Sequence, residues 1–243
     1  MITTGTTVRE VATELPQSTR IFEALKIDYC CGGNKPLSEA CASAGVDVDA
    51  VMEMLSKVTQ TGSENAGTMD FQNASIPELT THIVDTHHVF TKSELERLET
   101  LTAKVIGVHG ANHPELIRLG ELFKLLSDDL KPHMFKEEHI LFPYILAMVR
   151  ANENNQARPF APFGTVNNPI RMMMREHDNA GEIMREVRAL TSDYHAPADA
   201  CISYQTLYQA LENLEKDLHQ HIHLENNILF PKASELENAM NRG

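Results

Sequence analysis

One eleven-residue pattern occurs twice in the second half of the chain. The segments HMFKEEHILFP (133–143) and HIHLENNILFP (221–231) share a His, a Glu four residues later and a final Ile-Leu-Phe-Pro. A gapless alignment pairs His133 with His221 and Glu137 with Glu225. Residues four apart lie on the same face of a helix, so each copy presents an imidazole and a carboxylate together. The repetition predicts two helices that contribute equivalent groups to one site.

The predicted helices are short before residue 75 and long after it. Residues 1–58 contain short helical patterns, starting at a capping box of Thr7 and Glu10, and predict a small helical module. Residues 59–74 are polar and lack periodicity, so we interpret them as a linker. Residues 75–243 contain four long patterns, over approximately 75–105, 114–148, 168–190 and 203–235. Their short connections favour an all-α fold with an up-down-up-down four-helix bundle after the module.

Each predicted bundle helix carries one His on the apolar face that its helical period defines. The second and fourth helices add the Glu of the repeated pattern to that face. The inward-facing residues are His88, His133, Glu137, His177, His221 and Glu225. By contrast, His219 and His223 share a side with Glu212 and Lys216, and we expect them to be exposed. A single His on an apolar face is usually structural, so a metal site is inferred only from the whole set.

The two inward-facing carboxylates indicate a cation site. Burying one ionised carboxylate without a partner costs on the order of tens of kcal/mol by Born estimates, and no Lys or Arg occupies these faces. Imidazole with carboxylate suits first-row metals such as iron and zinc, and the donors suffice for two ions. Ferritin-like di-iron bundles use four carboxylates. The set here is richer in His, which favours ferrous or mixed-valence iron that binds a small diatomic molecule.

A centre of this type needs a fifth His, and the turn between the first two bundle helices offers two candidates. His109 and His113 both lie near the glycines that end the first helix. Spacing along the chain does not distinguish between them.

Cys30 and Cys31 form an adjacent pair that two glycines follow. A disulfide between adjacent Cys residues is strained, and glycine permits the positive φ of a helix C-cap. One interpretation is therefore a capped helix end with a buried thiol. The other is a flexible thiol pair that binds iron or transfers electrons. Cys41 and Cys201 are expected to fill the apolar core.

The composition argues against several classes of partner and location. A formal net charge of −13 opposes binding to nucleic acid or to an anionic membrane. The N-terminus lacks the pattern of a signal peptide, and no run approaches the roughly 18 apolar residues of a membrane helix. Four Cys residues, two of them adjacent, do not form a secreted disulfide framework. We therefore expect a cytoplasmic protein.

At these residues the chain resembles the hemerythrin-like family. More closely, it resembles the iron-sulfur cluster repair di-iron proteins, known as the repair of iron centres family. The resemblance spans essentially the whole chain. It is carried by the segments DYCCGGNKPL (28–37), PHMFKEEHILFP (132–143), EHD (176–178) and HLENNILFP (223–231).

The resemblance implies a non-haem centre of two iron ions. Its ligands would be His88, His109, His133, Glu137, His177, His221 and Glu225. It thus selects His109 over His113, and it makes Glu137 and Glu225 the bridges between the irons. One iron would be bound by His133, His177 and His221, and the other by His88 and His109.

The same resemblance implies a stress-response protein that helps restore iron-sulfur clusters damaged by nitric oxide or peroxide. Damaged iron-sulfur proteins would be its clients, nitric oxide or oxygen its small ligands, and donation of its own iron one route of repair. Two alternatives stay open: a nitric oxide reductase, and a hemerythrin-like sensor or carrier of oxygen or nitric oxide. The sequence does not determine the oligomeric state and is compatible with a homodimer.

Overall fold

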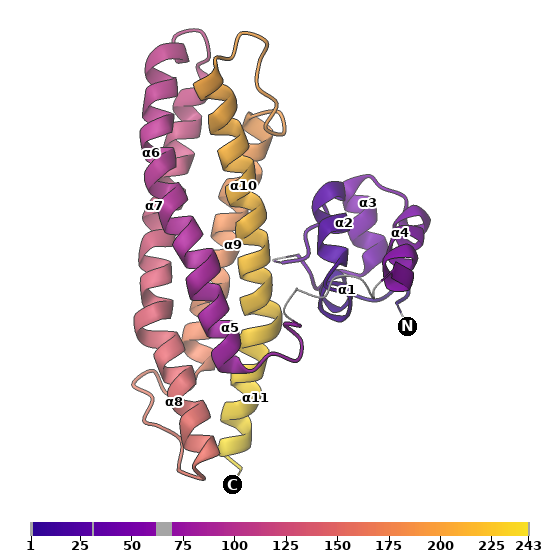
Figure 1. Ribbon diagram of the computed structural model, residues 1–243, viewed down its shortest axis with the longest axis vertical. Helices are drawn as coiled ribbons and strands as arrows, with labels where there is room; N and C mark the ends of the chain where they lie inside the picture. The colour runs from indigo at the N-terminus through magenta and orange to yellow at the C-terminus, as the bar shows by residue number, and fades with distance from the viewer. Residues whose placement is uncertain (1, 31, 62–69, 243) are drawn as a thin grey trace. The chain divides into compact units, whose positions relative to one another are not determined.

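The computed structural model describes residues 2–30, 32–61 and 70–242, and these residues form helices and loops without a β-strand (Figure 1). Four short or medium helices come first: α1 (Val8–Glu14), α2 (Ser18–Leu25), α3 (Leu37–Ala44) and α4 (Val48–Thr61). The remaining elements are α5 (Ile76–His82), η1 (Ile83–His88), α6 (Val89–His109), α7 (Glu115–Lys136), η2 (Glu137–Leu141), α8 (Phe142–Glu153), α9 (Asn167–Leu190), α10 (Ile202–Leu224), η3 (Glu225–Leu229) and α11 (Phe230–Met240). The three η segments are π-helical turns inside longer helices. The expected all-α fold is confirmed.

Residue contacts divide the chain into two compact units. One unit comprises Met1–Leu79 with His219–Ala233, and the other comprises Thr80–Leu218 with Ser234–Gly243. None of the described helices combines the length and apolar character that crossing a membrane requires. The predicted linker begins too early, because α4 continues to Thr61. Half of that linker, residues 62–69, lies outside the described residues.

The N-terminal helices pack around their own apolar core. The predicted capping box opens α1, where Glu10 N–H donates to Thr7 Oγ1 at 3.2 Å and Thr7 N–H donates to the Glu10 carboxylate at 2.9 Å. The buried core residues are Val8, Val11, Ala12, Phe22, Ile27, Tyr29, Leu37, Ala40, Cys41, Val51 and Leu55. Cys41 therefore fills the core as predicted.

The segment around Cys30 differs from the predicted helix end. Helix α2 already ends at Leu25, and Lys26 caps it in the left-handed conformation with a φ of 57°. Gly33 serves a different purpose, because a Cβ at this position would lie 2.6 Å from the Tyr29 carbonyl oxygen. The Gly33 carbonyl accepts a hydrogen bond of 2.8 Å from Arg9 N–H. Close backbone approach, rather than a helix cap, accounts for glycine here.

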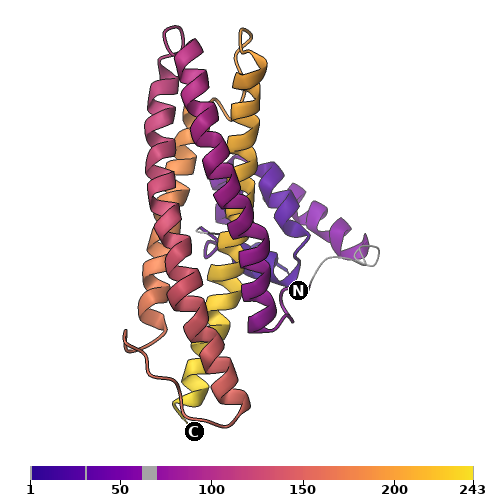
Figure 2. The ribbon, with the colours of Figure 1, turned by 60° about the vertical axis from the view of Figure 1, so that its left-hand side comes forward.

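The long helices run side by side and alternate in direction (Figures 1 and 2). The predicted capping box at Ser75 and Glu78 is present, with Ser75 N–H donating to the Glu78 carboxylate at 2.8 Å. One apolar core draws residues from α6, α7, α9 and α10, among them Leu95, Leu98, Leu119, Leu126, Met184, Leu207 and Leu214. The predicted four-helix bundle is thus confirmed.

The expectation that His223 faces solvent is wrong. Its side chain is only 6% exposed, and its ring centroid lies 5.4 Å from that of Tyr29. Asn227 Nδ2 lies 2.8 Å from His223 Nδ1 and donates to the Tyr29 carbonyl at 3.2 Å. Burial lowers the pKa of His223 to about 4. Helical spacing misplaced His223 because another segment of the same unit covers that side of α10.

A buried carboxylate fixes the loop between α8 and α9. Glu237 on α11 is 2% exposed and accepts hydrogen bonds from Arg158 Nη1 at 2.5 Å, Val166 N–H at 3.0 Å and the Thr165 hydroxyl. Burial raises the pKa of the Glu237 carboxyl, but these hydrogen bonds outweigh it and hold the pKa below its usual value of 4.5.

Replacing Glu237 by alanine should therefore destabilise the protein at pH 7. We expect the free energy of unfolding to fall by about 3 kcal/mol. This value of about 3 kcal/mol lies at the upper end of the range for losing hydrogen bonds to a charged group and at the lower end of that for breaking a buried ion pair. The pKa of Glu237 is lower in the folded protein than in the unfolded chain. The stability that its carboxylate contributes is therefore fully present above pH 4.5 and is lost as the pH falls through the folded-state pKa. Urea unfolding at pH 7 and pH 3 should show a smaller stability difference between the variant and wild type in acid. The exposed Glu235 on the same helix is the control, and an equal loss at both pH values would contradict the prediction.

Candidate metal centre

Buried His and Glu side chains form two groups that share both of their carboxylates. In each group, four residues each offer one ligand atom, and these atoms all lie within 4.8 Å of one another. The first group is His88, Glu137, His221 and Glu225, and the second is His133, Glu137, His177 and Glu225. Six of the seven residues in the predicted ligand set are thus brought together.

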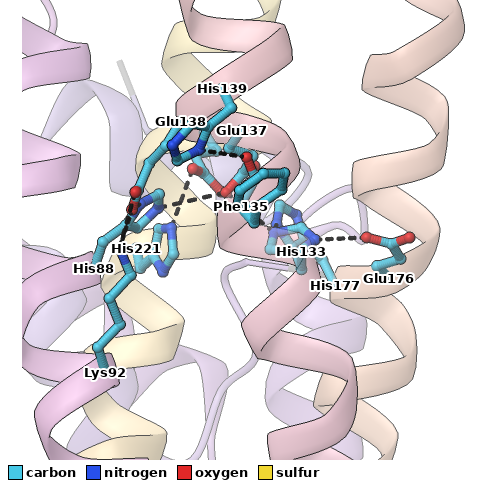
Figure 3. A network of polar contacts seen from close by, with 11 residues as sticks. His88, Lys92, His133, Phe135, Glu137, Glu138, His139, Glu176, His177 and His221 are labelled. Atoms are coloured by element: carbon cyan, nitrogen blue, oxygen red, sulfur yellow. Dashed lines mark hydrogen bonds and ion pairs between the residues drawn. The ribbon is translucent and has the colours of Figure 1, made fainter.

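The side chains of His88, His133 and His221 gather around Glu137 (Figure 3). His88 Nε2 and His133 Nε2 lie 3.4 Å and 3.2 Å from Glu137 Oε2. On the second copy of the repeated pattern, His221 Nε2 lies 3.0 Å from Glu225 Oε1. His177 Nε2 lies 3.0 Å from His133 Nε2. All six side chains are at most 2% exposed, so the donors converge in a site shielded from water.

The repeated pattern also creates a repeated backbone feature that periodicity did not reveal. Glu137 opens the π-helical turn η2 and Glu225 opens η3. In each turn the Glu carbonyl accepts a hydrogen bond from the N–H five residues later, at Phe142 or Phe230. The next residue in both copies is Pro, which has no N–H and clashes with a regular α-helical backbone. The wide turn accommodates that proline, and such turns are frequent at functional sites. The Pro that ends both copies was the feature of the sequence that indicated these π-helical turns.

Two carboxylates outside the groups accept hydrogen bonds from two of the histidines. His88 Nδ1 donates to Glu138 Oε1, and His133 Nδ1 donates to Glu176 Oε2, both at 2.7 Å. The hydrogen bond from His133, followed by that from Lys136, lowers the pKa of Glu176 to about 2. Burial raises the pKa of Glu138, but hydrogen bonds from Lys92 and His88 outweigh it and lower the pKa. Both carboxylates are thus ionised acceptors near neutral pH. Sequence reasoning missed them, although each adjoins a predicted ligand.

His109 does not join the two groups, contrary to the resemblance-based prediction. It ends α6, a helix of 21 residues, so it lies roughly 30 Å along the helix axis from His88 at 1.5 Å per residue. Its Nε2 lies 3.1 Å from Cys201 Sγ. The alternative, His113, lies in the same region and contacts Asp199 Oδ2 at 3.0 Å. Cys201 is exposed rather than part of the core, which corrects a second prediction.

The grouping also corrects the predicted division of the histidines. His221 lies in the group of His88, and not with His133 and His177. The structure places Cys30 in the N-terminal helical region, 6% exposed, with its Sγ 3.3 Å from Asp28 Oδ1. Cys31 lies outside the described residues.

The chemistry of the donors fits two metal ions. Two fully buried carboxylates lie close together, and the buried polar side chains of the described residues include no Lys or Arg. Such carboxylates must be protonated or bound to cations. Imidazole nitrogens and carboxylate oxygens together are typical ligands of first-row transition metals. A pair of groups with common carboxylates is the arrangement expected for a site of two ions.

Comparison with known proteins agrees with this geometry. Residues 79–233 match the family described as the hemerythrin HHE cation binding domain, and residues 4–59 match a domain of unknown function (DUF542). The chain is 31% identical to the iron-sulfur cluster repair protein ScdA of Staphylococcus haemolyticus over 96% of this chain and 100% of that protein. It is 35% identical to the iron-sulfur cluster repair protein YtfE of Dickeya chrysanthemi, over 92% of this chain and 94% of that protein. A probable iron-sulfur cluster repair protein of Haemophilus influenzae is 34% identical over 92% of this chain and 94% of its own length. The chain therefore belongs to the family of iron-sulfur cluster repair proteins, with a hemerythrin HHE domain that contains the buried His and Glu groups.

Proposed function

We propose that this protein is a di-iron protein that helps repair iron-sulfur clusters damaged by nitrosative or oxidative stress. The observation that carries the proposal is the pair of buried groups with two common carboxylates. The names of the full-length relatives supply the link to cluster repair. Damaged iron-sulfur proteins would then be the clients.

In this proposal the two metal positions have the same type of donors. His88 and His221 would bind one iron, His133 and His177 would bind the other, and Glu137 and Glu225 would bridge them. Bound iron would supply a ferrous-ferric couple and open coordination positions for a small molecule such as nitric oxide. The protein supplies a buried site in which imidazole nitrogens and carboxylate oxygens converge at both positions.

The thiols of Cys30 and Cys31 are proposed to take part in iron or electron exchange. A thiolate is the form that binds iron, and a buried thiol is a poor ligand. Because the Cys30 side chain is 6% exposed and contacts Asp28, the role requires this segment to open during exchange. The Tyr29 carbonyl next to it accepts a hydrogen bond from Asn227, so opening would break that contact.

Reactivation of a damaged cluster enzyme tests the function. A [4Fe-4S] dehydratase inactivated with nitric oxide is incubated without oxygen, either with the iron-loaded protein or with a His88→Ala/His177→Ala variant that lacks one imidazole from each group. We expect reactivation only by the iron-loaded wild type, with iron leaving the protein as activity returns. The His109→Ala variant is the matched control and should reactivate like wild type.

Two results would contradict the proposal. Equal reactivation by the double variant would show that the buried centre is not involved. A fully loaded wild type with one zinc per chain would exclude a di-iron centre. Replacing Cys30 and Cys31 by Ser should slow reactivation without changing the iron content. An unchanged reactivation rate would show that the two thiols do not take part in exchange.

A further inference from the structure

Each of the two groups contains one His in the same three-residue arrangement, which we call a Lys-Glu-His arm. Figure 3 shows the first arm, with Lys92, Glu138 and His88, and the His133–Glu176 contact of the second. In the first arm, Glu138 Oε1 accepts from His88 Nδ1 at 2.7 Å and from Lys92 Nζ at 2.6 Å. In the second arm, Glu176 accepts from His133 Nδ1 at 2.7 Å and from Lys136 Nζ. The first arm belongs to the His88 group and the second to the His133 group.

The two arms repeat one geometric design on different pairs of helices. His88 and Lys92 are four residues apart, and His133 and Lys136 are three apart, so each pair lies one turn apart on a single helical face. The carboxylate that joins them comes from a neighbouring helix: Glu138 from η2 and Glu176 from α9. In both cases this carboxylate directly adjoins a residue of the same group, Glu137 or His177. Each arm therefore ties together two helices that both contribute to one metal position.

The arms determine which nitrogen of the imidazole faces the centre. A carboxylate is only an acceptor when ionised, so the His Nδ1 must carry the proton. The neutral imidazole then presents the lone pair of Nε2, and this is the atom that lies 3.4 Å or 3.2 Å from Glu137 Oε2. The Lys ammonium balances the charge of the outer carboxylate. Each outer carboxylate therefore contacts a cation as well as an imidazole.

We propose that Glu138 with Lys92 and Glu176 with Lys136 are positioning residues, with one arm for each metal position. This inference rests on the proposed metal centre and specifies how each position is formed. The arms act through the orientation and tautomer of His88 and His133, and they do not bind the metal themselves. Removing one arm should lower the metal affinity of one position and leave that of the other unchanged, because the His of each arm belongs to only one group.

Metal titration of full-length variants tests the independence of the arms. Ferrous iron is titrated without oxygen against a colorimetric chelator. We expect Glu138→Ala and Glu176→Ala each to retain one tight position and to lose about 10 to 100-fold in affinity at the other, as is typical for outer hydrogen-bond partners of metal-bound His. Glu182→Ala changes an exposed carboxylate on α9 and should retain both positions.

A second measurement separates positioning from a general loss of structure. In zinc-loaded full-length protein labelled with ¹⁵N-His, the hydrogen-bonded Nδ1–H signal of His88 should disappear in Glu138→Ala and persist in Glu138→Gln, which keeps an acceptor oxygen. The corresponding signal of His133 should respond only to changes at Glu176.

The possible results are distinguishable. If wild type fails to bind two irons, the proposed function fails. If wild type binds two irons and both Ala variants bind them equally tightly, the arms are not positioning residues, although the proposed function stands. A loss of affinity with unchanged Nδ1–H signals would likewise overturn the inference.

Discussion

Replacing Glu225 by glutamine should reduce the metal content at both positions together, and Glu137→Gln should do the same. These two residues are the ones common to both groups. An uncharged amide neither neutralises a cation nor bridges two of them well. We expect iron affinity to fall by more than about 100-fold, because the loss of an outer hydrogen-bond partner already costs 10 to 100-fold.

The same replacements should stabilise the metal-free protein. Glu137 and Glu225 are both 0% exposed and offer carboxylate oxygens within 4.8 Å of each other, so without metal their charges repel or one must take up a proton. Glutamine has nearly the same shape and carries no charge. We therefore expect each variant to gain about 1 kcal/mol or more in unfolding free energy without metal, since replacing buried charged groups by neutral ones of similar volume is often stabilising.

Elemental analysis and urea unfolding with and without iron check both parts of this prediction. His109→Ala is the control because His109 contacts Cys201 instead of the two groups, and it should bind iron like wild type. A Glu225→Gln variant that keeps its full iron content would contradict the shared role of this carboxylate. A loss of iron in His109→Ala would contradict the position of His109 in the structure.

Removing the metal from wild type should lower its melting temperature substantially. A ligand at 1,000 times its Kd stabilises the folded state by about 4 kcal/mol per site, and 1 kcal/mol shifts Tm by about 2 to 4 °C for a chain of this size. Two filled positions therefore correspond to a decrease of at least about 15 °C on chelation. The carboxylates explain this dependence, since they are stable in the buried centre only with cations or protons.

Differential scanning calorimetry with and without a chelator measures this change. The Glu225→Gln variant should melt at the same temperature in both conditions, because it has little metal to lose. A wild type whose Tm changes by less than about 2 °C while its iron leaves would contradict the prediction, since tight binding to the folded state must stabilise it.

The repeated pattern was sufficient to identify most of the centre. Helical periodicity selected His88, His133, His177 and His221, and all four are buried. This succeeded because the faces of a long helix follow directly from residue spacing. The π-helical turns were missed because 3.6-residue periodicity assumes regular helices, although the prolines at 143 and 231 were visible.

Two of the errors concern side chains whose environment comes from a distant part of the chain. His223 was expected to be exposed, but Tyr29 covers it. Cys201 was expected in the core, yet it is exposed at a contact with His109. Amphipathic spacing defines only the face of one helix, and it carries no information about which remote segment packs on that face.

By itself, the sequence determined the helices, the apolar faces and six residues that combine imidazole with carboxylate. These properties depend on residues within a few turns of each other, where helix geometry is nearly constant. Only the tertiary structure decided that His221 lies with His88, that His109 lies away from the centre, and that Glu138 and Glu176 reach across to His88 and His133. These relations depend on which helices are neighbours and how far each is shifted along its axis. Packing of the whole chain sets both quantities, so spacing within one helix does not contain them.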